Sequence, residues 1–326
     1  MKTSRSLKIA AAIAVSALAL TGINATAASA ADSKKIYTLG GTDPFFAVVK
    51  NGFDSAADTV KAGGSTATWL AIKDWSNAGP DMNKITQTAV NAGADAIATP
   101  IWGAAAQVPA LQKVVKDGIP VVLYNTGIDL VKKVGALGYI GADDYVAGKA
   151  AGAAFAKAGI KNVLCLNGQP GAINTAARCK GVKDAEAAAG GKSTELALPA
   201  TKFGDATAIA AAVKGALTKD KTITGVLGLA QAFADASVTA IKAMGSKAIV
   251  GAFDISTNGL ANVKNGSQLF CVDQQGWLQG FMSTTIAWQY AAYGLLPATT
   301  TILTGPALIT KSNVDLVSAG VKTGQR

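Results

Sequence analysis

Short apolar runs alternate with helical patterns through most of this 326-residue chain, and this alternation constrains its fold most strongly. In each helical pattern, apolar residues recur at three- and four-residue steps. The strands predicted in the first half of the chain cover residues 35–39, 67–72, 96–99, 120–124 and 137–140. Because repeated strand–helix–strand units form parallel sheets with helices on both faces, the sequence predicts an α/β fold.

The same pattern restarts after about residue 140, which indicates a second α/β half. A small-residue helix over 145–158 leads into it. The strands predicted there cover residues 162–166, 195–198, 225–229, 248–253 and 269–272. A helix over 279–295 and a late strand over 307–310 follow, so the chain is expected to cross again between the two halves near its end.

The turn after the first predicted strand carries a polar and aromatic group. Gly40 and Gly41 end the strand, and Asp43, Phe45 and Phe46 surround a proline at the start of the next helix. In open α/β sheets, ligands bind at the carboxyl ends of strands. A carboxylate beside a flat apolar ring suits a small molecule with hydroxyls on its edge and C–H bonds on its face.

Residues 1–30 have the pattern of an export signal. Three basic residues precede an apolar run of about a dozen residues, and Ala28-Ser29-Ala30 offers small side chains for cleavage after Ala30. The run is short for a membrane span, and no cysteine for a lipid anchor follows it. We expect an exported protein of the periplasm, with enough remaining chain for two domains.

Charge and composition exclude several classes of function. The formal net charge is +10, but the lysines are scattered, and after residue 30 the arginines are Arg178 and Arg326, so nucleic-acid binding is not expected. The chain has no histidine, which is the usual general base of hydrolases and the commonest metal ligand. We expect neither an enzyme nor a bound metal or cofactor.

Several sequence blocks resemble one known family in order and spacing. They are Thr-Asp-Pro-Phe-Phe46, Ala-Thr-Pro100, Pro-Val-Val-Leu-Tyr-Asn125, Tyr-Ile-Gly-Ala-Asp-Asp-Tyr-Val-Ala-Gly-Lys149, Arg-Cys-Lys-Gly181, Val-Gly-Ala-Phe-Asp254 and Val-Asp-Gln-Gln-Gly-Trp-Leu-Gln-Gly280. Together they are similar to the ribose-type periplasmic sugar-binding proteins of ABC transporters. The resemblance runs from Lys35 to about Thr310.

This resemblance implies a type I periplasmic binding protein fold, with two Rossmann-like domains and parallel sheets joined by a three-segment hinge. The first domain is expected over residues 31–140 plus about 275–304, and the second over 141–274 plus about 305–326. Matching the blocks gives the expected ligand-binding residues: Asp43, Phe45, Phe46, Thr99, Asn125, Arg178, Phe203, Asp254 and Gln274. We expect Asp43 or Asp254 to balance the charge of Arg178.

Two places depart from the family pattern and bear on specificity. Asn125-Thr126 stands where the family usually has Asp-Arg, and Ala230-Gln231 stands where it usually has Asn-Asp. We therefore include Gln231 among the expected ligand-binding residues, and we do not name ribose as the ligand. Trp102 is a further candidate that would fill the freed space; the alternative is a partly exposed packing residue.

The three cysteines also bear on the resemblance. Cys165 lies in the first predicted strand of the second half and Cys179 in the helix after it, and relatives sometimes carry this pair. The resemblance implies a Cys165–Cys179 disulfide with Cys271 buried and free. The alternative is three reduced, buried thiols.

The expected function is capture of a sugar or polyol between closing domains and delivery to an ABC transporter permease. The protein is expected to act as a monomer, with a chemoreceptor as a second candidate partner. The alternative is a receptor of the same fold for a signalling molecule of the autoinducer-2 class.

Overall fold

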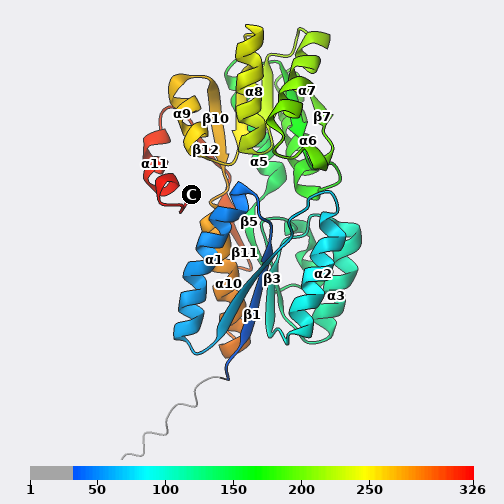
Figure 1. The fold of residues 1–326 in the computed structure, drawn as a ribbon, viewed down its shortest axis with the longest axis vertical. Coiled ribbons are helices and arrows are strands. Elements are labelled where there is room, and N and C mark those ends of the chain that lie inside the picture. The colour runs from blue at the N-terminus through cyan, green and yellow to red at the C-terminus, as the bar shows by residue number, and fades with distance from the viewer. Residues whose placement is uncertain (1–31) are drawn as a thin grey trace, which may run out of the picture. The chain divides into compact units, whose positions relative to one another are not determined.

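The computed structural model describes residues 32–326, so the expected signal segment and its cleavage site lie outside the described residues. The described chain forms two α/β lobes, one above the other in Figure 1. Within this range no helix is both long and apolar enough to cross a membrane.

The first lobe contains a six-stranded sheet in the order β11-β5-β4-β3-β1-β2. Its strands are β1 (Lys35–Gly40), β2 (Thr66–Ala71), β3 (Ala96–Thr99), β4 (Val121–Tyr124), β5 (Tyr139–Ala142) and β11 (Thr301–Gly305). Its helices are α1 (Pro44–Ala62), α2 (Ala78–Asn91), α3 (Ala104–Lys116), α4 (Val131–Val134) and α10 (Gly276–Tyr293), with the 3-10 turn η1 (Ile128–Leu130). Helices α1 and α10 cover one face of the sheet, and α2 and α3 cover the other (Figure 1).

The second lobe repeats this strand order as β12-β10-β9-β8-β6-β7. Its strands are β6 (Asn162–Asn167), β7 (Lys192–Ala197), β8 (Gly225–Gly228), β9 (Ile249–Phe253), β10 (Gln268–Asp273) and β12 (Ala307–Ile309). Its helices are α5 (Asp144–Lys157), α6 (Ile173–Ala188), α7 (Ala206–Lys219), α8 (Gln231–Met244), α9 (Thr257–Asn265) and α11 (Val314–Lys322), with the 3-10 turn η2 (Ala200–Lys202). All strand pairs are parallel except β10 with β12.

The chain passes between the two sheets three times, from β5 to α5, from β10 to α10 and from β11 to β12. These crossings fit the expected three-segment hinge. They support our proposal that the lobes are the two domains expected from the sequence. Each sheet has its own apolar core, with Ile97 and Val122 central in the first lobe and Val226 and Val250 in the second.

Helix α1 shows how the local sequence builds the first lobe. Asp43 caps its first turn, and Pro44 stands at a position where a helix needs no backbone N–H. A Cβ atom at Gly52 would collide with the carbonyl oxygen of Trp277 on α10, and one at Gly280 with that of Val49. These two glycines therefore allow α1 and α10 to pack backbone against backbone.

Two elements near the chain end were not predicted from the sequence. Strand β11 pairs with β5 at the edge of the first sheet, and its outer residue Leu303 is exposed. Helix α11 buries only Val314 and Val317 against α9 and β12. Helix α11 nevertheless has the apolar spacing of a helix, with Val314, Val317 and Val321 on one side, so the sequence contained a signal that could have predicted it.

The Cys165–Cys179 disulfide is confirmed, and Cys271 is buried and free. The bond joins β6 to α6 with a Cα–Cα distance of 5.8 Å. Closing a loop of about 15 residues stabilises the folded chain by roughly 3 kcal/mol in the chain-entropy treatment. It also fastens α6 to the sheet directly beside Arg178, which lies on that helix.

Candidate functional site

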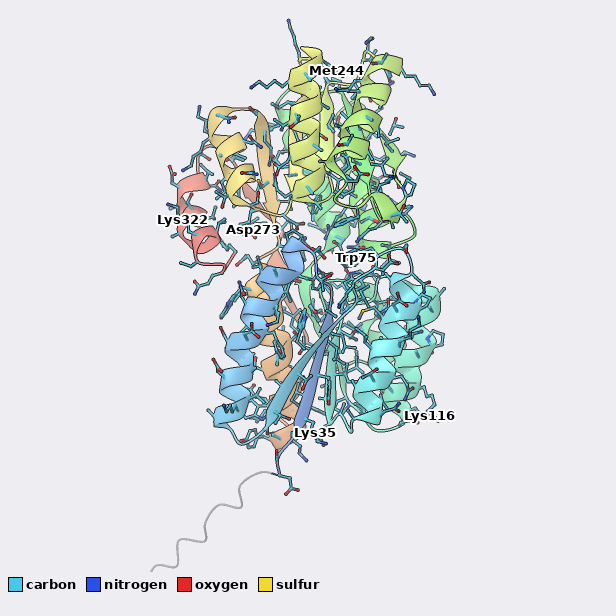
Figure 2. The ribbon with its side chains drawn as sticks, viewed as in Figure 1. Lys35, Trp75, Lys116, Met244, Asp273 and Lys322 are labelled. Carbon is cyan, nitrogen blue, oxygen red and sulfur yellow. A yellow bond between two sulfur atoms is a disulfide. The ribbon has the colours of Figure 1, made fainter. Side chains whose placement is uncertain are left out.

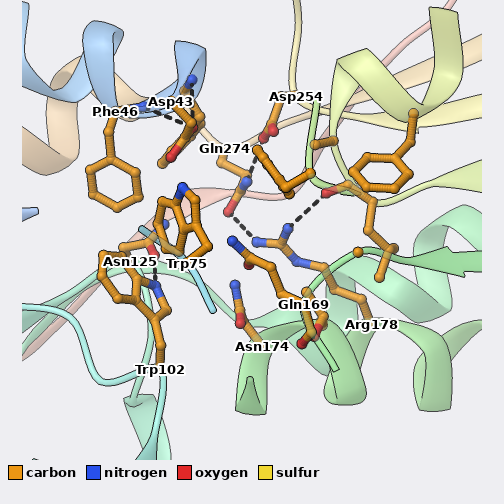
Figure 3. A pocket seen from close by; sticks show the side chains of 17 residues that line it. Asp43, Phe46, Trp75, Trp102, Asn125, Gln169, Asn174, Arg178, Asp254 and Gln274 are labelled. Carbon is orange, nitrogen blue, oxygen red and sulfur yellow. Dashed lines mark hydrogen bonds between the residues drawn. The ribbon is translucent and has the colours of Figure 1, made fainter. Parts of the chain in front are cut away.

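A cavity lies between the lobes, where the carboxyl ends of both sheets face each other (Figure 3). In both sheets the strand order reverses beside this point, at β1 and at β6, which is where ligands bind in open α/β sheets. We call it the central cavity. Its lining residues are Asp43, Phe45, Phe46, Trp75, Trp102, Asn125, Gly168, Gln169, Asn174, Thr175, Arg178, Phe203, Leu229, Ala230, Phe233, Asp254 and Gln274.

Asp43 and the two phenylalanines form one wall. The Asp43 Oδ1 accepts hydrogen bonds from the backbone N–H groups of Phe45 and Phe46, at 2.9 and 3.4 Å. Burial raises the pKa of Asp43 to about 6, although these two bonds lower it. The rings of Phe45 and Phe46 meet edge to face, with centroids 5.3 Å apart. The turn therefore presents a fixed carboxyl and a flat ring to the same space.

Two tryptophans form a further part of the cavity wall. Trp102 is 2% exposed, packs edge to face on Phe46, and donates from Nε1 to the Asn125 Oδ1 at 3.3 Å. Trp75 lies against Trp102, with ring centroids 4.6 Å apart, and reaches Phe203 of the second lobe at 6.0 Å. Figure 2 shows Trp75 between the lobes. Rings from both lobes thus meet around the cavity.

Arg178 is the polar centre of the second lobe's wall. Its Nε donates to the Asp144 Oδ1 at 2.8 Å, and its Nη2 donates to the Gln274 Oε1 at 2.8 Å. The guanidinium lies 4.3 Å from the centre of the Phe253 ring. We expected Asp43 or Asp254 to balance the charge of Arg178, but its ion pair is with Asp144 at the start of α5, which is buried with it. The charge of Arg178 also lowers the pKa of Asp254. Its Nη1 also donates to the carbonyl oxygen of Leu229 at 3.5 Å, so among the described residues one N–H on each terminal nitrogen stays available to a ligand.

Gln274 joins Arg178 to Asp254. Its Nε2 donates to the Asp254 Oδ1 at 2.6 Å, while its Oε1 accepts from Arg178. Asp254 follows β9 in the left-handed backbone region, with φ of 68°, which turns its carboxyl toward the cavity (Figure 3). Burial raises the pKa of Asp254 to about 7, against the lowering effect of Arg178 and Gln274. Hinge and cavity therefore share one hydrogen-bonded chain of side chains.

A family model described as a periplasmic binding protein domain matches residues 36–295. The structure is similar to a carbohydrate transporter from Acidothermus cellulolyticus 11B in complex with myo-inositol, at 31% identity over 90% of this chain and 100% of that chain, with a TM-score of 0.82. The chain belongs to the periplasmic binding protein family.

More distant structures share the fold. An ABC transporter solute-binding protein from Burkholderia graminis C4D1M in complex with D-arabinose is 22% identical over 87% of this chain and 97% of that chain, with a TM-score of 0.76. A glucose-galactose binding protein from Geobacillus stearothermophilus is 19% identical over 86% of this chain and 99% of that chain, also with a TM-score of 0.76. None of the curated proteins matches the chain. The expected type I periplasmic binding protein fold is confirmed.

Two predicted residues of this periplasmic binding protein lie outside the central cavity. Thr99 ends β3 with no exposed surface, and its hydroxyl donates to the carbonyl of Pro100. Gln231 donates from Nε2 to Asp235, one helical turn further along α8, and its side chain lines a neighbouring cavity instead. Local hydrogen bonds hold both side chains away from the central space. Neither residue lines the central cavity, and their contact with a ligand stays a prediction.

Gln169, Asn174 and Trp75 line the central cavity but were not predicted. Within residues 32–326, neither the Gln169 nor the Asn174 side-chain amide has a hydrogen-bond partner, although Asn174 is only 7% exposed. Figure 3 shows both amides beside Arg178. Each of the three residues comes after the carboxyl end of a strand. The rule that ligands bind at such strand ends, which pointed to Asp43, could therefore have pointed to them as well.

Free donors and acceptors therefore face each other across the central cavity. Asn125 is less available than expected, because its Oδ1 accepts from Trp102 and Thr126 and its Nδ2 donates to Gln279. Among the described residues, no group of three histidine, cysteine, aspartate or glutamate side chains is arranged to hold a metal ion. The site can hold a hydroxylated molecule between rings, with amides, carboxyls and one guanidinium at its edge.

The raised pKa values of Asp43 and Asp254 predict a pH-dependent stability. In the unfolded chain both carboxyls have a pKa near 3.8. In the folded protein Asp43 keeps its proton up to about pH 6 and Asp254 up to about pH 7, so between these values the folded state binds more protons than the unfolded state. Their contribution to stability is complete below pH 3.8 and is lost as the pH rises through 6 and 7. We expect the free energy of unfolding of the ligand-free protein to fall from pH 5 to pH 8, less so in Asp43→Asn/Asp254→Asn.

Urea unfolding at both pH values checks this prediction. The matched control is Asp220→Asn, because the pKa of Asp220 is lowered to about 2 and this group does not titrate in the window. The control should keep the wild-type difference between pH 5 and pH 8. An unchanged difference in the double variant would show that these two carboxyls are ionised throughout.

Proposed function

We propose that the protein is an extracytoplasmic binding protein that captures a sugar or polyol between its lobes and delivers it to an ABC transporter permease. One observation carries the proposal: the central cavity combines rings from both lobes with free amide, carboxyl and guanidinium groups. The 31% identical relative is named a carbohydrate transporter in complex with myo-inositol. A sugar or polyol offers C–H faces to the rings and hydroxyls to the polar edge.

The proposal also covers where the protein is located and how it acts. The family is periplasmic, and the export signal expected over residues 1–30 would take the protein there, with cleavage after about Ala30. We propose binding without catalysis, by a monomer, with the permease as its partner. Asp144 and Gln274 hold the guanidinium of Arg178 in place, which suits it to bind hydroxyls.

Ligand entry requires the lobes to part. Ile173 of the second lobe donates its backbone N–H to the carbonyl of Trp102 in the first, at 3.1 Å, and Trp75 contacts Phe203 across the cleft. These contacts place both lobes around the cavity in a closed arrangement. Hinge closure around a ligand is a known motion of periplasmic binding proteins.

A thermal-shift screen over pentoses, hexoses, polyols and inositols tests the proposal. A ligand at 100 times its dissociation constant should stabilise the protein by about 2.7 kcal/mol and raise its melting temperature. Small-angle scattering should show a smaller radius of gyration in the complex. A panel in which no sugar or polyol shifts the melting temperature would contradict the proposed function, and a ligand that binds without changing the radius would contradict closure.

A further inference from the structure

A second cavity adjoins the central cavity on the side of α1, α8 and α9. We call it the outer cavity. Six residues line both spaces: Asp43, Phe45, Phe203, Ala230, Asp254 and Gln274. Further residues that line the outer cavity are Gln231, Asp235, Thr257, Asn258, Asp273 and Arg326. The two cavities therefore share a wall that contains both candidate ligand carboxyls.

The central and outer cavities differ in volume. The central cavity has a volume of about 50 Å³ and the outer cavity about 400 Å³. Small-molecule sites usually have volumes of about 300–1,000 Å³. In this closed arrangement the central cavity alone is below that range, so a unit bound there needs the lobes to part slightly, whereas the outer cavity already falls within the range.

The outer cavity is also lined by free hydrogen-bond donors and free hydrogen-bond acceptors. Asp235 uses Oδ1 for Gln231 and Asn262, and its Oδ2 has no partner among residues 32–326. The side chain of Asn258 makes no hydrogen bond within the same range. Arg326 uses Nε for the ion pair with Asp273, at 3.3 Å, which leaves its terminal nitrogens as donors. Donors and acceptors around one space suit hydroxyls.

A third cavity borders the central one on the opposite side, past Trp75 and Trp102, with a volume of about 410 Å³. Its other walls are mostly alanine, glycine and proline from the starts of α2, α3 and α6. Ser76 there already donates to Asp74. It therefore has few side chains that could recognise hydroxyls, and the outer cavity is the better second site.

We propose that the physiological ligand has two hydroxylated units, one in the central cavity and one in the outer cavity, as in a disaccharide or a glycoside of a polyol. This inference rests on the proposed function and names the ligand class within it. Asp43, Asp254 and Gln274 stand where the two units join, so they contact both. Asp235, Asn258 and Arg326 contact the second unit alone.

Calorimetric titration with matched pairs of ligands tests this proposal: D-glucose with cellobiose, D-galactose with melibiose, and myo-inositol with its α-galactoside. We expect at least one two-unit ligand to bind ten times or more as tightly as its single-unit counterpart. In Asn258→Trp the new ring enters the outer cavity, and the ratio of the two affinities should fall at least tenfold. Thr257→Trp serves the same purpose if the first variant does not fold.

Ala261→Trp is the matched control, because Ala261 is exposed on the same helix and lines neither cavity. It should leave both affinities as in the wild type. Single-unit ligands that bind as tightly as every two-unit ligand would overturn this inference and leave the proposed function standing. A panel in which nothing binds would overturn both.

Discussion

Arg178→Ala should lower the free energy of unfolding by about 3–5 kcal/mol, because it leaves the carboxyl of Asp144 buried without its partner. Arg178 and Asp144 have side chains only 4% and 8% exposed, and their atoms are 2.8 Å apart. Burial raises the pKa of Asp144 even with Arg178 beside it, so its charge depends on that guanidinium. Urea unfolding at neutral pH measures the loss.

A double variant separates bracing from ligand binding. Replacing a buried ion pair by apolar residues of similar size is often neutral for stability, so Arg178→Met/Asp144→Leu should recover most of the loss. It should not recover ligand affinity, because the free N–H groups of the guanidinium are gone.

The variant Arg178→Lys tests the contribution of Arg178 to ligand affinity. Its ammonium can reach Asp144 but lacks the planar fork that also reaches Gln274. We expect it to lose about 2 kcal/mol or more of affinity for whichever screened ligand binds. Wild-type affinity in Arg178→Lys would mean that Arg178 only braces the second lobe.

Trp102→Ala should cost about 3–5 kcal/mol of stability, the usual range for removing a large buried aromatic side chain. Trp102 is 2% exposed and fills the space between Phe46, Trp75 and Asn125. Trp277→Ala is the matched control, because Trp277 is half-buried on α10 and stacks on Phe281 away from the cavity. Urea unfolding should show a clearly smaller loss for the control.

Trp102→Phe decides between the two roles considered for this residue. The variant keeps a ring against Phe46 but removes the N–H that holds the Asn125 Oδ1. If the indole helps to shape the ligand site, Trp102→Phe should fold and bind ligand more weakly than the wild type. Unchanged affinity would make Trp102 a packing residue only.

Much of the fold could be predicted from local sequence. Buried parallel strands are short apolar runs, and helices on a sheet repeat their apolar residues every three or four positions, so both leave signals inside windows of a few residues. The glycine pair and Pro44 are equally local signals, and they predicted the start of helix α1 correctly. Strand β11 was missed because it is an edge strand in which only Thr304 is buried, whereas helix α11 was missed although Val314 and Val317 have helical spacing.

The sequence by itself determined which residue types stand at the strand ends, and therefore where a ligand site can form. Only the tertiary structure decided which of those side chains are free to bind. Arg178 pairs with Asp144, 34 positions earlier in the chain, and Gln274 reaches Arg178 across 96 positions. Thr99 and Gln231 are held by nearby groups, whereas the side-chain amides of Gln169 and Asn174 have no partner within the described part of the chain. Such partners are set by how helices and sheets pack in space, and no local pattern in the sequence records that.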